Sequence, residues 1–332
     1  MKRIELVDGL FQGHGSLERG RGWVRPWRLP LETIRLYYPD ALRGAASMPA
    51  GVRLRLASDT TRVKVSIVPA GAPTALDCVV ENELVASAVI EPGGDECLFE
   101  GLPAREKRVE IYLPPKVPVK LASLEIDEGA SWAAEPENRP RWVVYGSSNV
   151  QCGGAASPAR TWPAIIARRH DLHLTCLGFG GQCHLEPMLA RLIRDLPADL
   201  IMIYVGSNIY SAASLSLRTF APAVIGFVQI VREKHPRTPI CVMSPLISPP
   251  SEGVPNAVGV TLGAMREETR RAVEELRALG DEALVYYDGM DVFTAEEAAR
   301  HMHDGVHPDA DGYRLMAERV DAAVMTPLVR RL

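Results

Sequence analysis

The periodicity of the apolar residues changes near residue 138, and this change restricts the chain to a small set of folds. Before it, short runs alternate apolar and polar residues, the pattern of strands with one buried and one solvent-facing side. The runs lie at 52–57, 62–68, 108–113 and 119–126. Turn-forming residues separate them, and we expect no helix of useful length before residue 130. The first part of the chain therefore predicts an all-β sandwich of the jelly-roll type.

Beyond residue 138, strand-like and helix-like runs alternate. Strands are predicted at 141–145, 173–178, 200–206, 239–245 and 283–288, and helices at 161–170, 186–196, 218–235 and 258–279. This order indicates α/β architecture, a parallel sheet with helices on both faces. Right-handed crossovers then give a three-layer, flavodoxin-like domain. The polar, proline-bearing segment 134–140 is typical of a linker. We therefore predict a β-sandwich domain over 1–137 and an α/β domain over 138–332.

The composition is that of an ordinary globular protein. The chain has 332 residues, of which 47% are hydrophobic and 23% charged, and its net charge is −4. It lacks the basic excess of a nucleic-acid binder, and no run is long and apolar enough to span a membrane. Charges interrupt the first residues too early for a signal peptide, so we expect a cytoplasmic protein. The six cysteines are scattered without Cys-x-x-Cys spacing, which favours free thiols over disulfides or a zinc site.

A candidate nucleophile follows the first strand of the α/β half. The four apolar residues 142–145 predict a buried strand, and Gly146-Ser147-Ser148-Asn149 ends it abruptly. The carboxyl end of such a strand is where open α/β sheets bind their ligands. We take Ser148 as the nucleophile; the alternative is a polar turn with no further role. Cys152 is another possible nucleophile, supported only by its proximity.

A candidate base lies near the C-terminus. Asp304 precedes His307 by three residues in a turn that contains Gly305 and Pro308. This spacing lets the carboxylate hold the Nδ1 proton of the imidazole, so that Nε2 is presented as a base. The alternative is a solvent-exposed turn before a helix. His301 and His303 are close in sequence, but their spacing matches no common zinc pattern.

Two further segments follow predicted strands and contain candidate donors for an oxyanion. Gly181 lies after the second strand and Asn208 after the third. A glycine permits close approach of a backbone N–H, and an asparagine supplies a side-chain amide. Together with the Ser148 N–H they could form an oxyanion hole. The alternatives are a tight turn for the glycine and a helix cap for Asn208.

Together these residues resemble the SGNH (GDSL-type) hydrolases, a family named for four blocks that carry Ser, Gly, Asn and His. The blocks occur here in the family order, over roughly residues 140–332: Gly146-Ser147-Ser148, Gly180-Gly181, Gly206-Ser207-Asn208 and Asp304-Gly305-Val306-His307-Pro308. The resemblance implies that Ser148 is the nucleophile, His307 the base and Asp304 the residue that orients it. It also implies that Gly181 and Asn208 are oxyanion donors.

Three positions depart from the family pattern. Ser147 replaces the Asp before the nucleophile, Ile209 replaces the Asp that often follows the third-block Asn, and the Asn that often opens the second block is replaced near Cys176. None of these changes removes a group that performs chemistry. They do weaken any transfer of substrate identity, and they leave Ser147 as a possible nucleophile, although the Gly-x-Ser register favours Ser148.

The β-rich half adds to the resemblance. A jelly-roll domain ahead of an SGNH domain is similar to certain carbohydrate esterases, and to an acyltransferase of aromatic-polyketide tailoring. Trp162, Tyr210 and the proline-rich loop 248–255 are candidates for the wall of a substrate pocket. For Trp162, which precedes Pro163 at a predicted helix start, core packing is the preferred alternative.

These observations favour a serine esterase that acts on a small-molecule ester, such as an O-acetylated sugar or metabolite, through an acyl-serine. The second hypothesis is an acyltransferase that delivers the acyl group to an alcohol of a specialised metabolite. A third is a binding or scaffold protein whose site has decayed. Neither enzymatic hypothesis requires a metal or an organic cofactor, and the sequence makes no prediction of oligomeric state.

Overall fold

The computed structural model describes residues 1–135 and 137–332, and the chain folds into two compact units. The sandwich unit comprises Met1–Arg139 and Ala156–Cys176, and the α/β unit comprises Pro140–Ala155 and Leu177–Leu332. Residues 156–176 thus group with the first part of the chain. Of the predicted linker 134–140, Pro136 lies outside the described residues. The predicted domain boundary between 137 and 138 stays a prediction.

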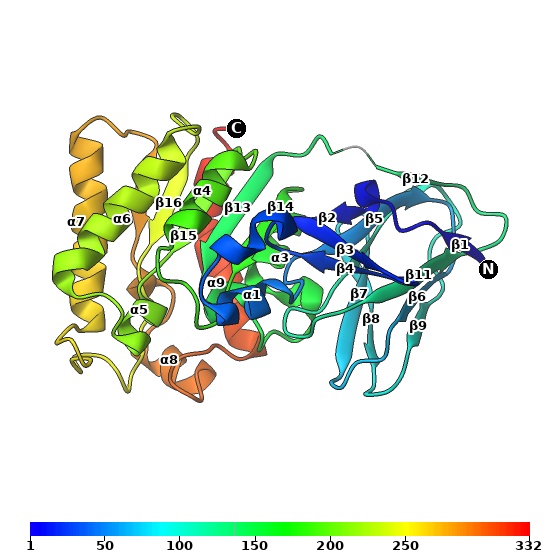
Figure 1. Ribbon diagram of the computed structural model, residues 1–332, viewed down its shortest axis with the longest axis horizontal. Helices are drawn as coiled ribbons and strands as arrows, with labels where there is room; N and C mark the ends of the chain where they lie inside the picture. The colour runs from blue at the N-terminus through cyan, green and yellow to red at the C-terminus, as the bar shows by residue number, and fades with distance from the viewer. Residues whose placement is uncertain (136) are drawn as a thin grey trace. The chain divides into compact units, whose positions relative to one another are not determined.

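The sandwich unit contains two six-stranded sheets, drawn mostly in blue and cyan in Figure 1. The first has the order β3 (Ser16–Gly20), β4 (Trp23–Trp27), β11 (Leu121–Ile126), β6 (Val63–Ile67), β9 (Glu96–Phe99), with β1 (Lys2–Ile4) beside β11. The second has the order β12 (Trp132–Ala134), β5 (Arg53–Ser58), β10 (Lys107–Tyr112), β7 (Thr74–Val80), β8 (Glu83–Ile90), with β2 (Phe11–Gln12) beside β5. Neighbouring strands pair antiparallel, for example β5 with β10. The predicted all-β sandwich is confirmed.

Alternating side chains from both sheets form one core. Val63, Val65 and Ile67 of β6 are buried, whereas Lys64 and Ser66 between them are partly exposed, as the alternation predicts. The same core includes inward residues of β5, β7, β10 and β11. Burial of these apolar faces against each other holds the two sheets together.

The sandwich unit also has helical segments. Before residue 130 there is one short α-helix, α1 (Asp40–Ala46), which the sequence pattern missed, and two 3-10 turns, η1 (Asp8–Leu10) and η2 (Leu31–Leu36). Leu42, Ala45 and Ala46 make the buried side of α1. Its seven residues are too few to show helical periodicity in the sequence. Residues 156–176 add η3 (Pro158–Arg160), α3 (Trp162–Arg169) and the start of β14.

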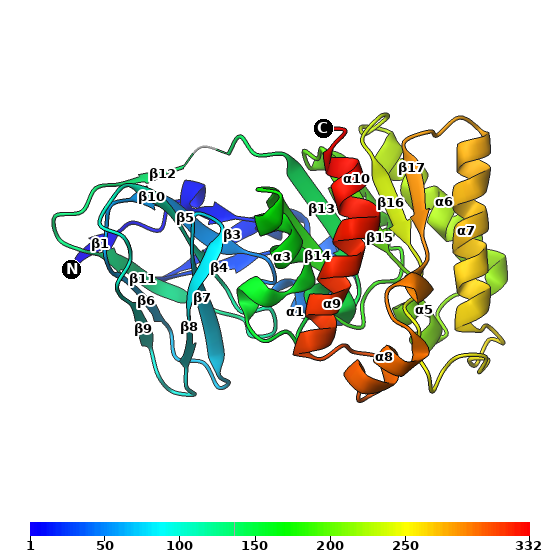
Figure 2. The same cartoon turned by 180° about the vertical axis from the view of Figure 1, so that it is seen from behind.

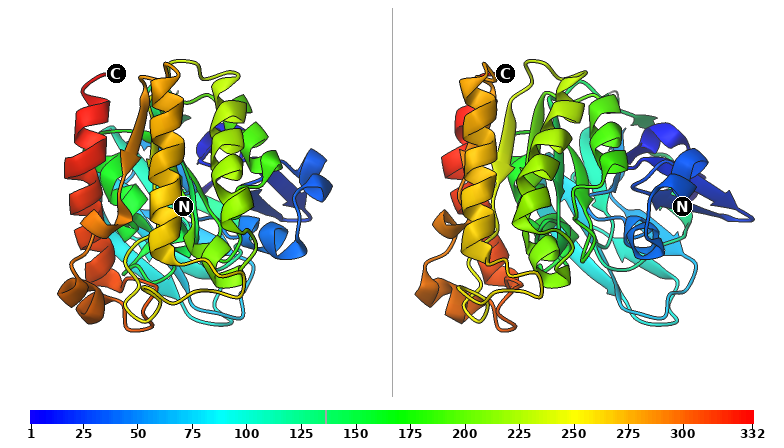
Figure 3. Two further views of the ribbon diagram at one scale, coloured as in Figure 1. Left: turned by 90° about the vertical axis from the view of Figure 1, so that its left-hand side faces the viewer. Right: turned by 60° about the vertical axis from the view of Figure 1, so that its left-hand side comes forward.

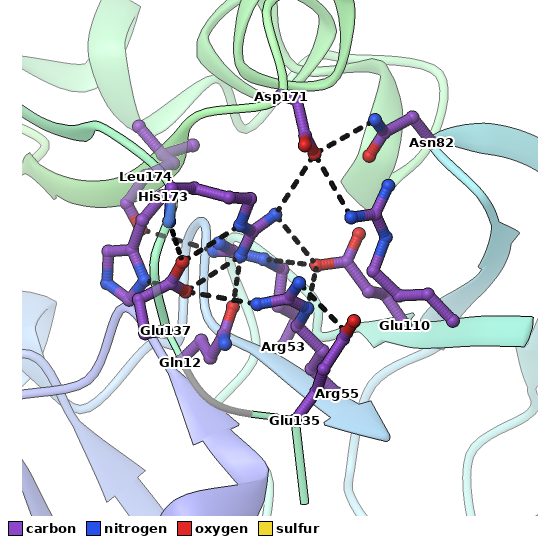
Figure 4. A network of polar contacts seen from close by, with 12 residues as sticks. Gln12, Arg53, Arg55, Asn82, Glu110, Glu135, Glu137, Asp171, His173 and Leu174 are labelled. Carbon is purple, nitrogen blue, oxygen red and sulfur yellow. Dashed lines mark hydrogen bonds and ion pairs between the residues drawn. The ribbon is translucent and has the colours of Figure 1, made fainter. Parts of the chain in front are cut away.

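The face of β5 and β10 that points away from the apolar core is not exposed to solvent, which differs from the prediction. Arg53, Arg55 and Glu110 occupy positions that alternation assigns to solvent, yet all three are buried. Arg53 Nε lies 3.1 Å from Glu110 Oε1, and each side chain is 1% exposed. Figure 4 shows the network around them, in which Glu135 and Glu137 also contact Arg55. Paired charges thus cover this face of the sheet in place of water.

The network includes a histidine and a carboxylate whose pKa values are shifted. His173 Nδ1 lies 2.5 Å from Glu137 Oε2, and Arg139 Nη2 lies 2.9 Å from the same oxygen. Burial raises the pKa of Glu137, but the hydrogen bonds from His173 and Arg139 outweigh it and hold the pKa well below its usual range. Burial lowers the pKa of His173 more than the bond to Glu137 raises it. The pair is therefore a neutral imidazole that donates to a carboxylate.

The α/β unit is built on a five-stranded sheet of order β14 (His173–Gly178), β13 (Arg141–Gly146), β15 (Leu200–Tyr204), β16 (Ile240–Met243), β17 (Leu284–Tyr287). The pairs β13–β15, β15–β16 and β16–β17 are parallel. In chain order the strands read 2-1-3-4-5, the flavodoxin-like arrangement. This confirms the predicted fold class.

Helices cover both faces of this sheet. Figure 3 shows the strands between a layer that contains α6 (Leu217–Arg232) and α7 (Leu262–Ala278) and a layer formed by α9 (Ala310–Val320) and α10 (Thr326–Val329). Figure 2 shows α9 and α10 from their own side. The other helical segments of the unit are α2 (Ser148–Gln151), α4 (Pro187–Asp195), α5 (Ser207–Ala212), η4 (Gly289–Asp291), α8 (Ala295–His301) and the π-helical turn η5 (Asp321–Met325). In the part of the chain that the structure describes, no helix has the length and apolarity to cross a membrane.

The strand order determines where a site can form. Since β13 lies between β14 and β15, the chain reverses its direction of progress across the sheet beside β13. The crevice at the carboxyl ends of the strands at such a point is the usual ligand site of open α/β sheets. The three predicted sequence blocks that contain Ser148, Gly181 and Asn208 each follow the carboxyl end of one of these strands.

Candidate active site

Ser148 begins the four-residue helix α2 directly after β13. Ser147 is the N-cap of α2, and its Oγ accepts a hydrogen bond from the Asn149 N–H at 3.3 Å. Serine is a favoured N-cap, so the residue that replaces the family Asp has a structural use. Since Ser148 is the first residue of the helix, its own N–H has no intrahelical acceptor. The sequence did not predict α2, which is too short to show periodicity.

The structure brings Ser148, His307 and Asp304 together. Ser148 Oγ lies 2.8 Å from His307 Nε2, and His307 Nδ1 lies 2.6 Å from Asp304 Oδ2. Asp304 Oδ1 accepts two backbone hydrogen bonds in the same loop, from the N–H groups of Val306 at 2.9 Å and His307 at 2.7 Å. The carboxylate therefore fixes both the loop and the imidazole. This is the arrangement that a nucleophile, a base and an orienting acid require.

The environment keeps Asp304 ionised. Partial burial raises the pKa of its carboxyl, but the backbone N–H and the imidazole of His307 and the Val306 N–H lower it further, to about 2. An ionised Asp304 accepts a hydrogen bond from the Nδ1–H of His307 and so leaves Nε2 free to face Ser148 as an acceptor. The Asp304 side chain is 57% exposed and that of His307 is 44% exposed.

Two side chains hold the loop of the base, residues 304–307, in a role that the sequence did not predict for them. Asn149 Nδ2 donates to the Val306 carbonyl at 3.3 Å, and Ser248 Oγ donates to the Gly305 carbonyl at 2.8 Å. Both side chains are buried. Asn149 directly follows the candidate nucleophile in sequence. The sequence did not predict α2, and so it gave no indication that the Asn149 side chain points toward residue 306. Ser248 shows that one end of the proline-rich loop supports the loop of the base.

The second block forms the turn after β14. A Cβ on Gly178 would lie 2.3 Å from the Gln151 nitrogen, so only glycine permits β14 to approach α2 this closely. Gly181 has φ +70°, a backbone conformation that glycine adopts readily. Between them, a Cβ on Gly180 would lie 3.5 Å from the Ser148 Cβ. The turn that carries Gly181 thus lies directly against the candidate nucleophile.

The third block is connected to the second through Asn208. Asn208 lies in the first turn of α5, and its Oδ1 accepts the Cys183 N–H at 3.1 Å. This bond assigns the oxygen end of the amide, so that Nδ2 is the end left to donate. Ile209, where the family often has Asp, is fully buried and belongs to the core.

Three candidate oxyanion donors on these segments have no partner within the described part of the chain. The N–H groups of Ser148 and Gly181 and the Asn208 Nδ2 have no acceptor among the residues that the structure describes. Donors fixed in position before the reaction can stabilise a charge that develops on a substrate oxygen. The arrangement can therefore support acyl transfer through a tetrahedral intermediate.

Tyr210 holds the proline-rich loop. Its hydroxyl donates to the Val254 carbonyl at 2.9 Å, and Asn256 Nδ2 donates to the Tyr210 carbonyl at 3.0 Å. Tyr210 also lines a small cavity of about 30 Å³ together with Ser207, Leu246 and other residues of this region. Its use in substrate binding stays a prediction.

Trp162 is fully buried in the sandwich unit. Complete burial favours the core-packing alternative over contact with a substrate. Cys152 is also fully buried, and its Sγ donates to the Asn149 carbonyl at 3.2 Å. That placement favours Ser148 over Cys152 as nucleophile.

His301 and His303 both contact Asp309, at 3.2 and 3.5 Å. Among the described residues, no group of three or more His, Cys, Asp or Glu side chains is arranged to hold a metal ion. The two histidines therefore serve the start of α9, where Asp309 is the N-cap.

Comparison with known proteins identifies both parts of the chain. Residues 139–325 match the GDSL-like lipase/acylhydrolase family, and residues 10–118 match the N-terminal domain of SsfX3. No curated protein matches. The structure is similar to that of the salicylyl-acyltransferase SsfX3 from a tetracycline biosynthetic pathway, with 35% identity, 99% of each chain covered and a TM-score of 0.90.

Two more distant structures share the fold. A GDSL-like lipase from Bacteroides ovatus is 21% identical, with 97% of this chain and 96% of that chain covered and a TM-score of 0.76. A family two carbohydrate esterase from Clostridium thermocellum is 14% identical, with 85% and 93% covered and a TM-score of 0.64.

The matches favour an enzyme over a binding protein, and they support acyl transfer to an alcohol better than the esterase hypothesis. They cover both units, which confirms the predicted two-part resemblance. The chain therefore belongs to the GDSL-like lipase/acylhydrolase family and is an ester hydrolase or acyltransferase that acts on small-molecule acyl substrates.

Proposed function

We propose that the protein is an acyltransferase that moves an acyl group, by way of Ser148, to an alcohol of a specialised metabolite. The observation that carries this proposal is the 35% identity to SsfX3 over 99% of both chains. SsfX3 is a salicylyl-acyltransferase of a tetracycline pathway. An aromatic acyl group of this kind and a polycyclic or similarly large alcohol are therefore the substrate classes that we propose.

In the first step, His307 Nε2 accepts the Ser148 proton while Ser148 Oγ attacks the acyl carbonyl. The 2.8 Å contact between these two atoms supports the assignment. Asp304 holds the Nδ1 proton and stabilises the imidazolium. The negative charge on the substrate oxygen is stabilised by the N–H groups of Ser148 and Gly181 and the amide of Asn208. Collapse of the intermediate breaks the bond to the leaving group, which takes the proton from His307, and an acyl-serine remains.

In the second step, an alcohol replaces the leaving group. His307 accepts the proton of the acceptor hydroxyl as its oxygen attacks the acyl-serine. The second intermediate collapses with release of Ser148 Oγ, which recovers the proton from His307. The product is a new ester. Hydrolysis follows the same steps with water as the acceptor, so acceptor choice alone separates the two activities. A cytoplasmic location remains our expectation.

The test is the pre-steady-state reaction of the enzyme with p-nitrophenyl acetate and p-nitrophenyl benzoate. We expect a burst of about one nitrophenolate per enzyme, followed by slow turnover in buffer, because water is a poor acceptor. Added alcohols should raise the slow rate and yield the corresponding ester by mass spectrometry. Rapid turnover in buffer without a burst would instead support an esterase.

Ser148→Ala and the exposed control Ser87→Ala separate the nucleophile from general effects. We expect Ser148→Ala to lose the burst and at least about 10⁴-fold in rate, while Ser87→Ala behaves as wild type. A peptide mass increase from the acyl group should map to Ser148 in the trapped wild-type enzyme. A fully active Ser148→Ala would disprove the proposed nucleophile.

A further inference from the structure

The Gly181 N–H can act as an oxyanion donor only if the turn that carries it is held in a fixed position. It lies in the irregular segment between β14 and α4, and no atom lies within 4 Å of a Cβ built on Gly181. The Cβ side of Gly181 is therefore open, and within the turn the Gln182 N–H bonds to the Phe179 carbonyl at 3.0 Å. A preorganised oxyanion donor must nevertheless be held in place before the reaction, because its value comes from avoiding rearrangement.

One support comes from the nucleophile helix. Gln151 is the last residue of α2, three positions after Ser148, and its side chain is buried. Its Oε1 accepts the Gly180 N–H at 2.7 Å. A Cβ on Gly180 would meet this oxygen at 3.2 Å and the Ser148 Cβ at 3.5 Å. Gln151 thus ties the peptide that precedes Gly181 to the same helix that presents Ser148.

A second support comes from the other side of the turn. His184 Nε2 lies 3.1 Å from the Gly181 carbonyl oxygen, and His184 Nδ1 lies 2.7 Å from Ser214 Oγ. A carbonyl oxygen can only accept, so Nε2 carries a proton, and in the neutral ring Nδ1 accepts from the Ser214 hydroxyl. Ser214 follows α5, the helix that carries Asn208.

These contacts join the elements of the oxyanion hole. Gln151 links the Gly180–Gly181 peptide to the nucleophile, His184 links it to the end of α5, and Cys183 N–H links it to Asn208 Oδ1 at 3.1 Å. We propose that Gln151 and His184 are positioning residues that hold the Gly181 N–H and the Asn208 amide as a preformed oxyanion hole. This inference rests on the proposed acyl-serine chemistry.

The principal test compares Gln151→Met, which removes the acceptor at similar volume, with Gln151→Glu, which keeps an acceptor oxygen. The measurement is the acylation rate and KM with p-nitrophenyl acetate. Loss of a direct oxyanion donor costs about 10² to 10³ in rate, so loss of its support should cost about 10-fold to 100-fold in kcat with KM changed less than about twofold. Gln151→Glu should recover most of the rate. The exposed Gln229→Met on α6 is the matched control.

His184→Ala, at a partly exposed position, and Ser214→Ala, at an exposed one, provide a second test in which folding is less at risk. Each should lower the acylation rate, and the double variant should lose little more than His184→Ala, since both changes break one chain of contacts. Thermal unfolding of every variant checks that the fold is retained.

Two outcomes would overturn the proposal: wild-type acylation in both Gln151→Met and His184→Ala, or equal losses in Gln151→Met and Gln151→Glu. Both outcomes can be distinguished from failure of the proposed function, because in that case the Ser148→Ala variant would remain active. They also differ from the esterase outcome, which changes deacylation and not acylation.

Discussion

Carboxylates pair with basic side chains in both units, but in opposite surroundings. In the α/β unit, Asp304 and His307 are 57% and 44% exposed and belong to one loop. In the sandwich unit, Arg53 and Glu110 are 1% exposed each and come from neighbouring strands. In the proposed mechanism the first pair orients a base at a site that must admit a substrate. The second neutralises charges that the fold has removed from water (Figure 4).

The comparison indicates that burial determines how much a charge pair contributes to the free energy of unfolding. A pair in water contributes little to the free energy of unfolding, because solvent screens it. Breaking a buried pair leaves an uncompensated charge in the interior and is costly. We therefore expect substitutions at Asp304 to lower the rate with little change in stability, and substitutions at Glu110 to do the reverse.

Asp304→Asn should have the largest effect of the three changes considered below. We expect a loss of about 10² to 10⁴ in kcat/KM, because the amide no longer holds the Nδ1 proton and the wrong tautomer of His307 faces Ser148. Urea denaturation should show nearly wild-type stability. The pKa of Asp304 is about 2, so its carboxylate is ionised at every pH from 5 to 9. A rate that changes with pH over this range in the wild-type enzyme therefore does not report the titration of Asp304. The exposed Asp311→Asn serves as control. Full activity of Asp304→Asn would mean that another group orients His307.

Glu110→Gln should affect stability and leave the acylation rate of the folded protein unchanged. Loss of this charge leaves Arg53, Arg55 and Arg139 without one of their buried partners. We expect the free energy of unfolding to fall by about 3 kcal/mol, measured by urea denaturation. The exposed pair of Glu296 with Arg300 offers the control, because Glu296→Gln should change stability by less than about 0.5 kcal/mol. Equal stability of the two variants would remove the distinction drawn above.

Mild acid should produce the smallest effect, again through the buried network. The pKa of His173 is lowered by burial, so the unfolded chain binds a proton at this residue before the folded chain does. The stability that His173 contributes is present above its unfolded pKa of about 6.5 and is lost as pH falls below it. Glu137, whose pKa is also lowered, adds to the loss below about pH 4.

The measurement is the urea midpoint at pH 7.5 and pH 5.0. Wild type should lose about 1 kcal/mol more than His173→Gln over this interval. His170→Gln, in the same unit, is the comparison at a partly exposed histidine. An identical pH dependence in wild type and His173→Gln would show that this histidine does not couple folding to protons.

Sequence periodicity predicted both fold types, the five strands of the parallel sheet and the sandwich strands β5, β6, β10 and β11, because alternation and the β/α order depend on neighbours close in the chain. It missed the other sandwich strands, among them β7 and β8. The buried face of β5 and β10 could not be predicted. Arg55 and Glu110 alternate like solvent-facing residues, and some of their partners, Glu137 for Arg55 and Arg139 for Glu110, are distant in sequence. In a sequence pattern, a charged residue that is buried with a distant partner looks the same as a charged residue that faces solvent.

The candidate site shows the same division. Ser148, Asp304 and His307 follow from short motifs, and their contacts lie where those motifs predict. The supporting residues Asn149, Gln151 and His184 carry no motif. Their roles arise from α2 and from turns whose direction is determined by tertiary contacts, so spacing alone does not identify them.

The loop of the base has a consequence for how such enzymes diverge. Asp304 bonds to the imidazole and to two backbone N–H groups within the four residues 304–307. So short a closure costs little chain entropy, and Asn149 and Ser248 each add one hydrogen bond to it from outside the loop. The orientation of the proposed general base is therefore determined mainly within its own segment, and loop 248–255 contacts that segment through Ser248. If residues 304–307 supply the acid–base chemistry, as we propose, the part of loop 248–255 beyond Ser248 can diverge without altering the internal geometry of that segment.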